Sequence, residues 1–172
     1  IQGAVDAVIT GAISVSAGTY EENIAIDDKS ITLKSSDGPD STIIKPSNNS
    51  VPILWLKGAK DLDLRSTIEG FTLKDAGNPS WNDARGSALK ITNSSSATII
   101  NMIFADADSE PFAASSNGTA GPVKLYNCIF YGTKRGETFF DNDGNIGLEI
   151  YNSVFANNAQ AGINYSNSNY NP

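Results

Sequence analysis

The sequence predicts an all-β fold, a single-stranded right-handed parallel β-helix of about six coils behind a short N-terminal capping α-helix. Three observations predict it: a repeat of 25 to 31 residues, short runs of alternating apolar and polar residues between turn residues, and a change of side-chain parity inside each repeat. Each coil of such a stack buries its apolar side chains only against its neighbours.

The repeat is clearest in the second half of the chain. Four segments align without gaps, with spacings of 31, 26 and 25 residues: residues 68–75, 99–106, 125–132 and 150–157. Repeats of this length with a strand in each unit are typical of solenoids. The alignment therefore predicts that these segments stack directly above one another.

A change of parity inside the repeat predicts a corner. Inward side chains occur at every second position of a strand, yet the apolar residues Ile99 and Phe104 are an odd number of positions apart. The residues able to reset the parity are Gly70, Asn101, Asn127 and Asn152, because glycine and asparagine accept a left-handed backbone most readily. We expect a one-residue corner there, a stack of the phenylalanines that follow it, and a buried ladder of asparagine amides.

The first half follows the same logic with different residues. Residues 29–35 recur as residues 60–66, again offset by 31, and further alternating runs occupy 13–15, 24–26, 42–44 and 53–56. Ile1, Val5, Val8 and Ile9 have the spacing of an amphipathic helix. We expect one domain, with a helical cap over 1–10, coils over 11–163 and a polar tail over 164–172. A helix with no start signal before it indicates a chain excised from a longer one.

Composition restricts the partners and the location. A net charge of −7 repels nucleic acid phosphates, and no apolar run is long enough for membrane insertion. The single cysteine, Cys128, excludes an internal disulfide, and the absence of histidine excludes a zinc site built on imidazole. An uncharged polar surface favours an extracellular or cell-surface location. The open ends of a solenoid expose strand edges, so end-to-end or lateral self-association is also expected.

Several segments carry a family resemblance. Residues 1–8, 13–24, 29–35 and 42–44 resemble the N-terminal cap and first coils of the pectin-lyase-like superfamily. The Arg85-Gly-Ser-Ala-Leu run and the Asn-x-x-Phe pattern are similar to repeat modules of bacterial surface and autotransporter-type proteins. The resemblance implies the fold and leaves the activity open, because the superfamily includes lyases, hydrolases, esterases, epimerases, phage tailspikes and non-catalytic adhesins.

The catalytic signatures of that superfamily are mostly missing. The Gly-His-Gly element of polygalacturonase-like hydrolases needs a histidine, and the Gln-Asp and Asp-Phe-Ile-Phe-Gly elements of pectin methylesterases do not occur. We therefore expect a non-catalytic module that presents a rigid face for carbohydrate or partner binding. A structural stalk or spacer is one alternative.

A calcium-dependent polysaccharide lyase is the other alternative. It needs carboxylates to hold Ca²⁺ and a lysine or arginine as base. Asp106, Asp108 and Glu110 are the candidate ligands, and Lys134 or Arg135 is the candidate base one coil later. The same residues also fit an ordinary solvated turn.

A long polar loop supplies a candidate carbohydrate site. Trp81 stands in a polar surrounding with Asn82, Asp83 and Arg85. An exposed indole stacks on sugar rings, and the three neighbours could bond sugar hydroxyls. Equally, Trp81 could fold back to cover the edge of a coil.

Overall fold

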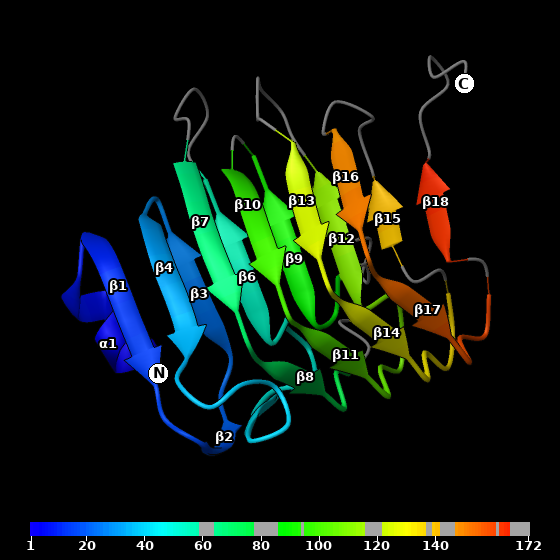
Figure 1. Ribbon diagram of the computed structural model, residues 1–172, viewed down its shortest axis with the longest axis horizontal. Coiled ribbons are helices and arrows are strands. Elements are labelled where there is room, and N and C mark those ends of the chain that lie inside the picture. The colour runs from blue at the N-terminus through cyan, green and yellow to red at the C-terminus, as the bar shows by residue number, and fades with distance from the viewer. Residues whose placement is uncertain are drawn as a thin grey trace.

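The computed structural model of the chain is a parallel β-helix with a short helix at its N-terminal end (Figure 1). The structure describes residues 1–58, 64–77, 86–93, 95–115, 122–136, 139–141, 147–160 and 162–165. Successive coils follow one another along the long axis, from β1 at one end to β18 at the other.

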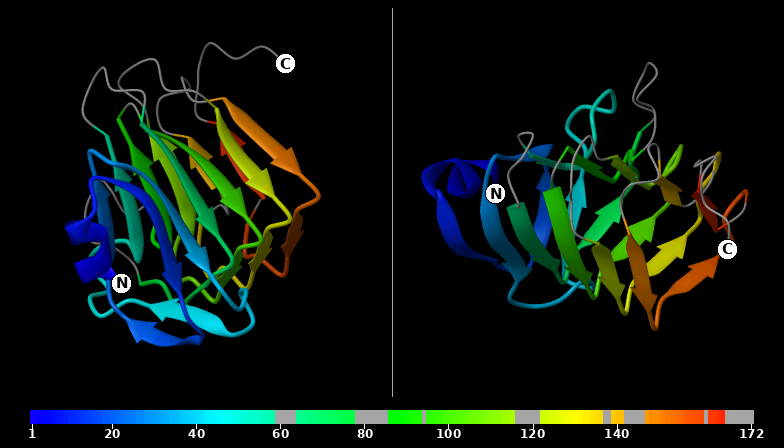
Figure 2. Two further views of the ribbon diagram at one scale, coloured as in Figure 1. Left: turned by 60° about the vertical axis from the view of Figure 1, so that its left-hand side comes forward. Right: turned by 90° about the horizontal axis from the view of Figure 1, so that it is seen from above.

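Three parallel sheets run along the solenoid, and each takes every third strand (Figure 2). Sheet A contains β1 Thr10–Val15, β4 Ser30–Ser35, β7 Leu64–Glu69, β10 Ser95–Ile100, β13 Val123–Tyr126 and β16 Leu148–Tyr151. Sheet B contains β2 Gly18–Glu21, β5 Thr42–Lys45, β8 Thr72–Lys74, β11 Ile103–Ala105, β14 Ile129–Tyr131 and β17 Val154–Ala156. Sheet C contains β3 Ile24–Asp27, β6 Leu54–Lys57, β9 Leu89–Thr92, β12 Phe112–Ser115, β15 Phe139–Asp141 and β18 Ile163–Tyr165. The predicted all-β solenoid of about six coils is confirmed.

The strand register confirms the repeat in the second half and corrects it in the first. Ile68, Ile99, Leu125 and Ile150 are successive partners, as the spacings of 31, 26 and 25 require. Leu33, however, pairs with Ile68, which is an offset of 35. The predicted offset of 31 is wrong because an alternating pattern matches itself equally well after a shift of four residues.

The predicted corners between sheets A and B are present. Their backbone φ angles are positive at Gly70 (81°), Asn101 (50°), Asn127 (54°) and Asn152 (47°). Asn152 donates from Nδ2 to Oδ1 of Asn127 at 2.7 Å, so part of the amide ladder forms. The expectation that this ladder is buried is wrong, since Asn101, Asn127 and Asn152 are all exposed.

Two further columns of left-handed corners went unpredicted. The column after sheet B contains Asp75, Asp106, Gly132 and Asn157, each directly following its strand. Asp28 and Asn93 hold the same position after sheet C. From the third coil onward, the corners after sheets A and B therefore use Asp, Asn or Gly, the residues that tolerate positive φ, and so do two corners after sheet C.

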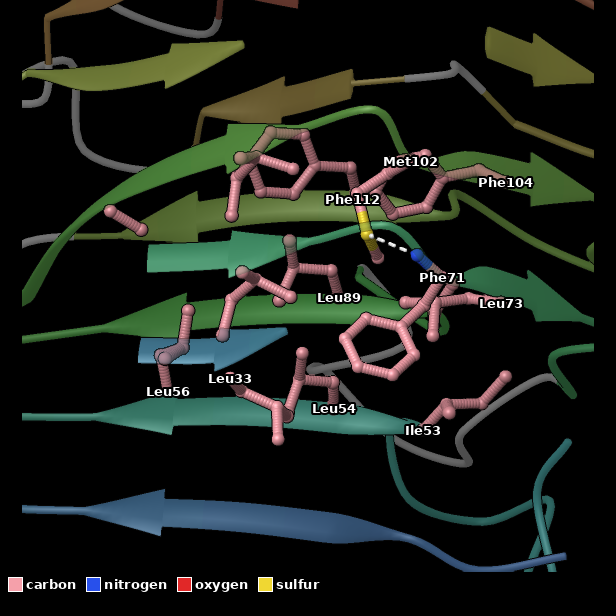
Figure 3. Close-up of a cluster of buried hydrophobic side chains, with 14 of the residues drawn as sticks. Leu33, Ile53, Leu54, Leu56, Phe71, Leu73, Leu89, Met102, Phe104 and Phe112 are labelled. Carbon is pink, nitrogen blue, oxygen red and sulfur yellow. Dashed lines mark hydrogen bonds between the residues drawn. The ribbon is translucent and has the colours of Figure 1, made fainter. Parts of the chain in front are cut away.

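The core is one continuous column of apolar side chains inside the three sheets (Figure 3). The ring centroids of Phe104 and Phe130 are 4.4 Å apart, and those of Phe130 and Phe155 are 4.8 Å apart. Phe112 on sheet C packs against the first two rings. The backbone N–H of Phe71 donates to Sδ of Met102 at 3.2 Å. The predicted phenylalanine stack is therefore confirmed.

A short helix lies at the N-terminal end of the core. Helix α1, Gln2–Ala7, buries Val5 against the first coil and covers the N-terminal end. The helix is shorter than the predicted 1–10, because Val8 is already extended (φ −111°, ψ 146°) and Ile9 is 85% exposed. No helix in the described residues has the length and apolar character to cross a membrane.

Candidate functional site

The charged residues of the lyase hypothesis gather at the turn between sheets B and C. Asp106 is the left-handed corner directly after β11, and Asp108 and Glu110 follow it before β12. Lys134 and Arg135 lie one coil later, between β14 and β15. The backbone N–H of Lys134 donates to the carbonyl of Ala107 at 2.9 Å, which fixes the two turns beside each other.

These charges pair between coils and do not converge on a common centre. Lys134 Nζ lies 2.7 Å from Asp108 Oδ1, and Arg135 Nε donates to the Asp108 carbonyl at 3.1 Å. Asp106 instead pairs with Lys74 at 3.6 Å, and Glu110 accepts a hydrogen bond from the Ser109 hydroxyl. Within the described part of the chain, no group of three or more Asp, Glu or Cys side chains could hold a metal ion.

Two titratable groups are unsuited to catalysis at neutral pH. The hydrogen bond and the charge of Asp108 raise the pKa of Lys134, so this lysine stays protonated and is a poor general base. Burial raises the pKa of Cys128 to about 11, so its thiol is not an activated nucleophile.

The loop predicted to bind carbohydrate starts and ends at the same turn. Trp81, Asn82, Asp83 and Arg85 lie outside the described residues, so their role stays a prediction. The residues on either side are described. The carbonyl of Ala76 accepts from the backbone N–H of Asp108 at 2.8 Å, and the backbone N–H of Gly86 donates to the Glu110 carbonyl at 3.0 Å. Both ends of the loop are thus held beside Asp108 and Glu110.

The outer face of sheet A carries a different arrangement, ordered in rows by the strand register. One row runs through Thr32, Thr67, Thr98, Lys124 and Glu149, and the next runs through Lys34, Glu69, Ile100, Tyr126 and Tyr151. Strand partners in a sheet are about 4.8 Å apart, so each row is a ladder along the solenoid axis. Toward the C-terminal coils, the first row changes from threonines to a lysine and a glutamate, and the second row changes to tyrosines.

A hollow of about 170 Å³ lies on this face, across β7, β10 and β13. Its lining is Arg65, Ser66, Thr67, Ser96, Ala97, Thr98, Pro122 and Lys124. The hydroxyl groups of Thr67, Ser96 and Thr98, with a guanidinium and an ammonium, therefore surround a space of a few water molecules' size, while the Ser66 hydroxyl bonds the backbone of residues 29 and 31. We call it the sheet A hollow.

A pair of tyrosines lies beside the sheet A hollow. The rings of Tyr126 and Tyr151 stack with centroids 4.8 Å apart, and Tyr151 is 47% exposed. The Tyr151 hydroxyl donates to Glu149 Oε2 at 3.0 Å, and Lys124 Nζ, which lines the hollow, is 3.2 Å from the same carboxylate. The Lys124 hydrogen bond, followed by that of Tyr151, lowers the pKa of Glu149. These contacts hold the ring of Tyr151 in place relative to Lys124 at the rim of the hollow.

Sequence reasoning missed this face although a signal was present. The dipeptide Tyr-Asn recurs at 126–127 and at 151–152, and its asparagine is in both cases a predicted corner. The corner asparagine ends the sheet A strand, and Leu125, directly before the first of these tyrosines, is an apolar residue that faces inward. Because side chains alternate along a strand, Tyr126 must point outward.

Comparison of the chain with protein-family models, with curated proteins and with solved structures finds no match in any of the three. The assignment of the fold as a parallel β-helix therefore rests on the strand order and register of the structure.

Proposed function

We propose that this chain is a non-catalytic β-helix module that binds a glycan on the outer face of sheet A. The observation that carries the proposal is the sheet A hollow with the stacked Tyr126 and Tyr151 beside it. A secreted or cell-surface location and membership of the pectin-lyase-like superfamily are part of the same proposal. The polar composition and the resemblance of the N-terminal coils support them.

The chemistry of the face suits a sugar. Sugar hydroxyls both donate and accept hydrogen bonds, and serine and threonine hydroxyls do the same. Arg65 and Lys124 add donors, and tyrosines offer amphipathic surface to the C–H groups of a sugar ring. Thr67 and Thr98 are partners on the paired strands β7 and β10. Their backbone is already ordered, so ligand binding costs little conformational entropy there.

The charged side chains at the turn between sheets B and C are arranged as ion pairs and do not suit an elimination reaction. Lys134 is protonated and paired with Asp108, and the carboxylates beside it have separate partners. A lyase needs a free base next to a cation site, and these side chains supply neither in this arrangement. We therefore place the ligand on sheet A and propose no elimination chemistry.

Calorimetric titration of neutral and acidic glycans tests the proposal. The double substitution of Thr67→Val and Thr98→Val keeps the side-chain shape and removes two hydroxyls. It should weaken binding roughly tenfold, since each hydrogen bond contributes about 0.5–1.5 kcal/mol. Tyr151→Ala should weaken it as well.

The matched control is Thr19→Val, which changes an exposed threonine on sheet B. It should leave glycan affinity unchanged. A flat response of the unsubstituted protein to the whole panel would leave the spacer alternative in place of binding. Equal losses in Thr19→Val and in the double variant would show that the effect does not arise at the hollow.

A further inference from the structure

A second hollow, of about 180 Å³, lies on the outer face of sheet C and shares no residue with the sheet A hollow. Its lining is Asn23, Ile24, Ala25, Val51, Pro52, Trp55 and Lys57. We call it the Trp55 hollow. Its walls are mostly apolar, with one amide and one ammonium group, which is the usual make-up of a small-molecule site.

The strand register explains why the Trp55 hollow exists. Ala25 on β3 is the direct partner of Trp55 on β6, so a methyl group lies beside an indole and leaves space above the sheet. Asn23 holds the adjoining wall: its Nδ2 donates to the carbonyls of Val51 at 3.3 Å and Pro52 at 2.9 Å. The hollow is therefore formed before any ligand arrives.

The indole is fixed and has cations close to it. Trp55 Nε1 donates to Thr92 Oγ1 at 3.1 Å. Lys57 Nζ lies 4.3 Å from the centre of the indole, and Lys90 Nζ lies 5.3 Å from it. The carboxylate paired with Lys57 is that of Asp27, at a long 3.8 Å. An anionic group would thus complete the charge pairing of Lys57 at this hollow.

We propose that the Trp55 hollow binds a small aromatic carboxylate, with its ring over Ala25 against the indole and its carboxylate on Lys57. The ring would cover the apolar walls, and the carboxylate would meet the ammonium group that lines them. The chain's net charge of −7 opposes anions at long range. At physiological salt, charges more than about 8 Å apart are largely screened, so the ammonium group of Lys57, which lines the hollow, outweighs the distant charges.

Tryptophan fluorescence can follow this binding directly. The chain has two tryptophans, so the W81F variant leaves Trp55 as the only reporter. Titration of this variant with benzoate should change its emission with a dissociation constant in the millimolar range, as expected for a ligand of about nine non-hydrogen atoms. Benzyl alcohol, of nearly the same shape but uncharged, should bind about fivefold or more weakly.

Two substitutions in the W81F background separate the two parts of the proposal. A25L fills the hollow from an outward-facing position and should abolish the response. K57M keeps the apolar stem, removes the charge and should make benzoate and benzyl alcohol bind equally. K45M, a lysine on sheet B paired with Asp75, is the control and should bind like W81F alone.

Three outcomes would overturn the proposal. One is no emission change with benzoate up to tens of millimolar. Another is equal affinity for benzoate and benzyl alcohol without K57M, which would remove the role of the charge. The third is a response that survives A25L, which would place the ligand elsewhere on the indole. None of these outcomes bears on glycan binding at sheet A, because the two hollows have separate residues.

Discussion

Left-handed backbone residues directly follow many of the strands and mark where the chain turns into the next sheet. In the described part of the chain, every non-glycine residue with positive φ is an aspartate or an asparagine: Asp28, Asp75, Asn93, Asn101, Asp106, Asn127, Asn152 and Asn157. Other side chains pay about 1–2 kcal/mol for this conformation. Backbone geometry thus explains eight of the Asn and Asp residues, and one of them is Asp106, a candidate calcium ligand of the lyase hypothesis.

Asn127 offers a direct test of this role. Asn127→Val places a β-branched side chain at φ 54° and removes the acceptor for Asn152 Nδ2. We expect a loss of about 2–3 kcal/mol in the free energy of unfolding, measured by urea denaturation. Asn127→Gly loses the same hydrogen bond without the backbone strain and should lose less than about 1 kcal/mol. Equal losses in the two variants would contradict a conformational role.

At the scale of an element, a strand's contribution depends on its place in the stack. Phe130 on β14 is fully buried, with the rings of Phe104 and Phe155 on either side. Phe155 on β17 stacks on one phenylalanine and is only partly buried. In a solenoid each coil is stabilised by its immediate neighbours, so the same residue type should be worth less in the last coil.

Alanine substitutions measure this difference. Phe130→Ala leaves a cavity with rings on both sides and should reduce the free energy of unfolding by about 3–5 kcal/mol. Phe155→Ala should cost about half as much, since its side chain is less buried. Hydrogen exchange should show faster opening confined to the C-terminal coils for Phe155→Ala. A larger loss for Phe155→Ala in urea denaturation would contradict the nearest-neighbour account.

The sequence predicts features that depend on residues close together in one repeat, but not features that depend on how one coil pairs with the next. The asparagine corners and the Phe104 stack follow from spacing inside gap-free repeats, and both are present. The pairing of Leu33 with Ile68 could not be predicted, because an alternating strand has no local feature that distinguishes shifts of four residues. The Trp55 hollow could not be predicted either. It depends on the pairing of Ala25 with Trp55, and the register between these two strands does not follow from the local pattern of either strand.

For the whole molecule, exposed ion pairs link neighbouring coils along the axis. In the described residues, six lysines each pair with an acid on an adjacent coil at 2.7–3.8 Å: Lys34–Glu69, Lys45–Asp75, Lys57–Asp27, Lys74–Asp106, Lys124–Glu149 and Lys134–Asp108. Exposed pairs of this kind contribute little each, and salt screens them. The pH dependence of global stability should therefore come mainly from a buried titratable group.

Cys128 is that group on the alkaline side. Burial raises the pKa of its thiol from 9.0 to about 11, while the Sγ lies 3.4 Å from the Tyr126 carbonyl. Because the folded-state pKa is raised, the unfolded chain releases the proton first. The contribution of the thiol is complete below pH 9.0 and is lost as the pH rises through about 11.

Urea denaturation between pH 7 and pH 11 measures this loss. We expect the free energy of unfolding to fall by about 2–3 kcal/mol over the upper part of that range, at 1.36 kcal/mol per pKa unit. Cys128→Ala has a lower stability at pH 7, because it leaves a small cavity, but it should lack this component of the alkaline decline. Lys124→Met, which removes an exposed ion pair, should keep the decline. An identical decline in Cys128→Ala and the unsubstituted chain would show that exposed groups, and not the buried thiol, set the alkaline limit.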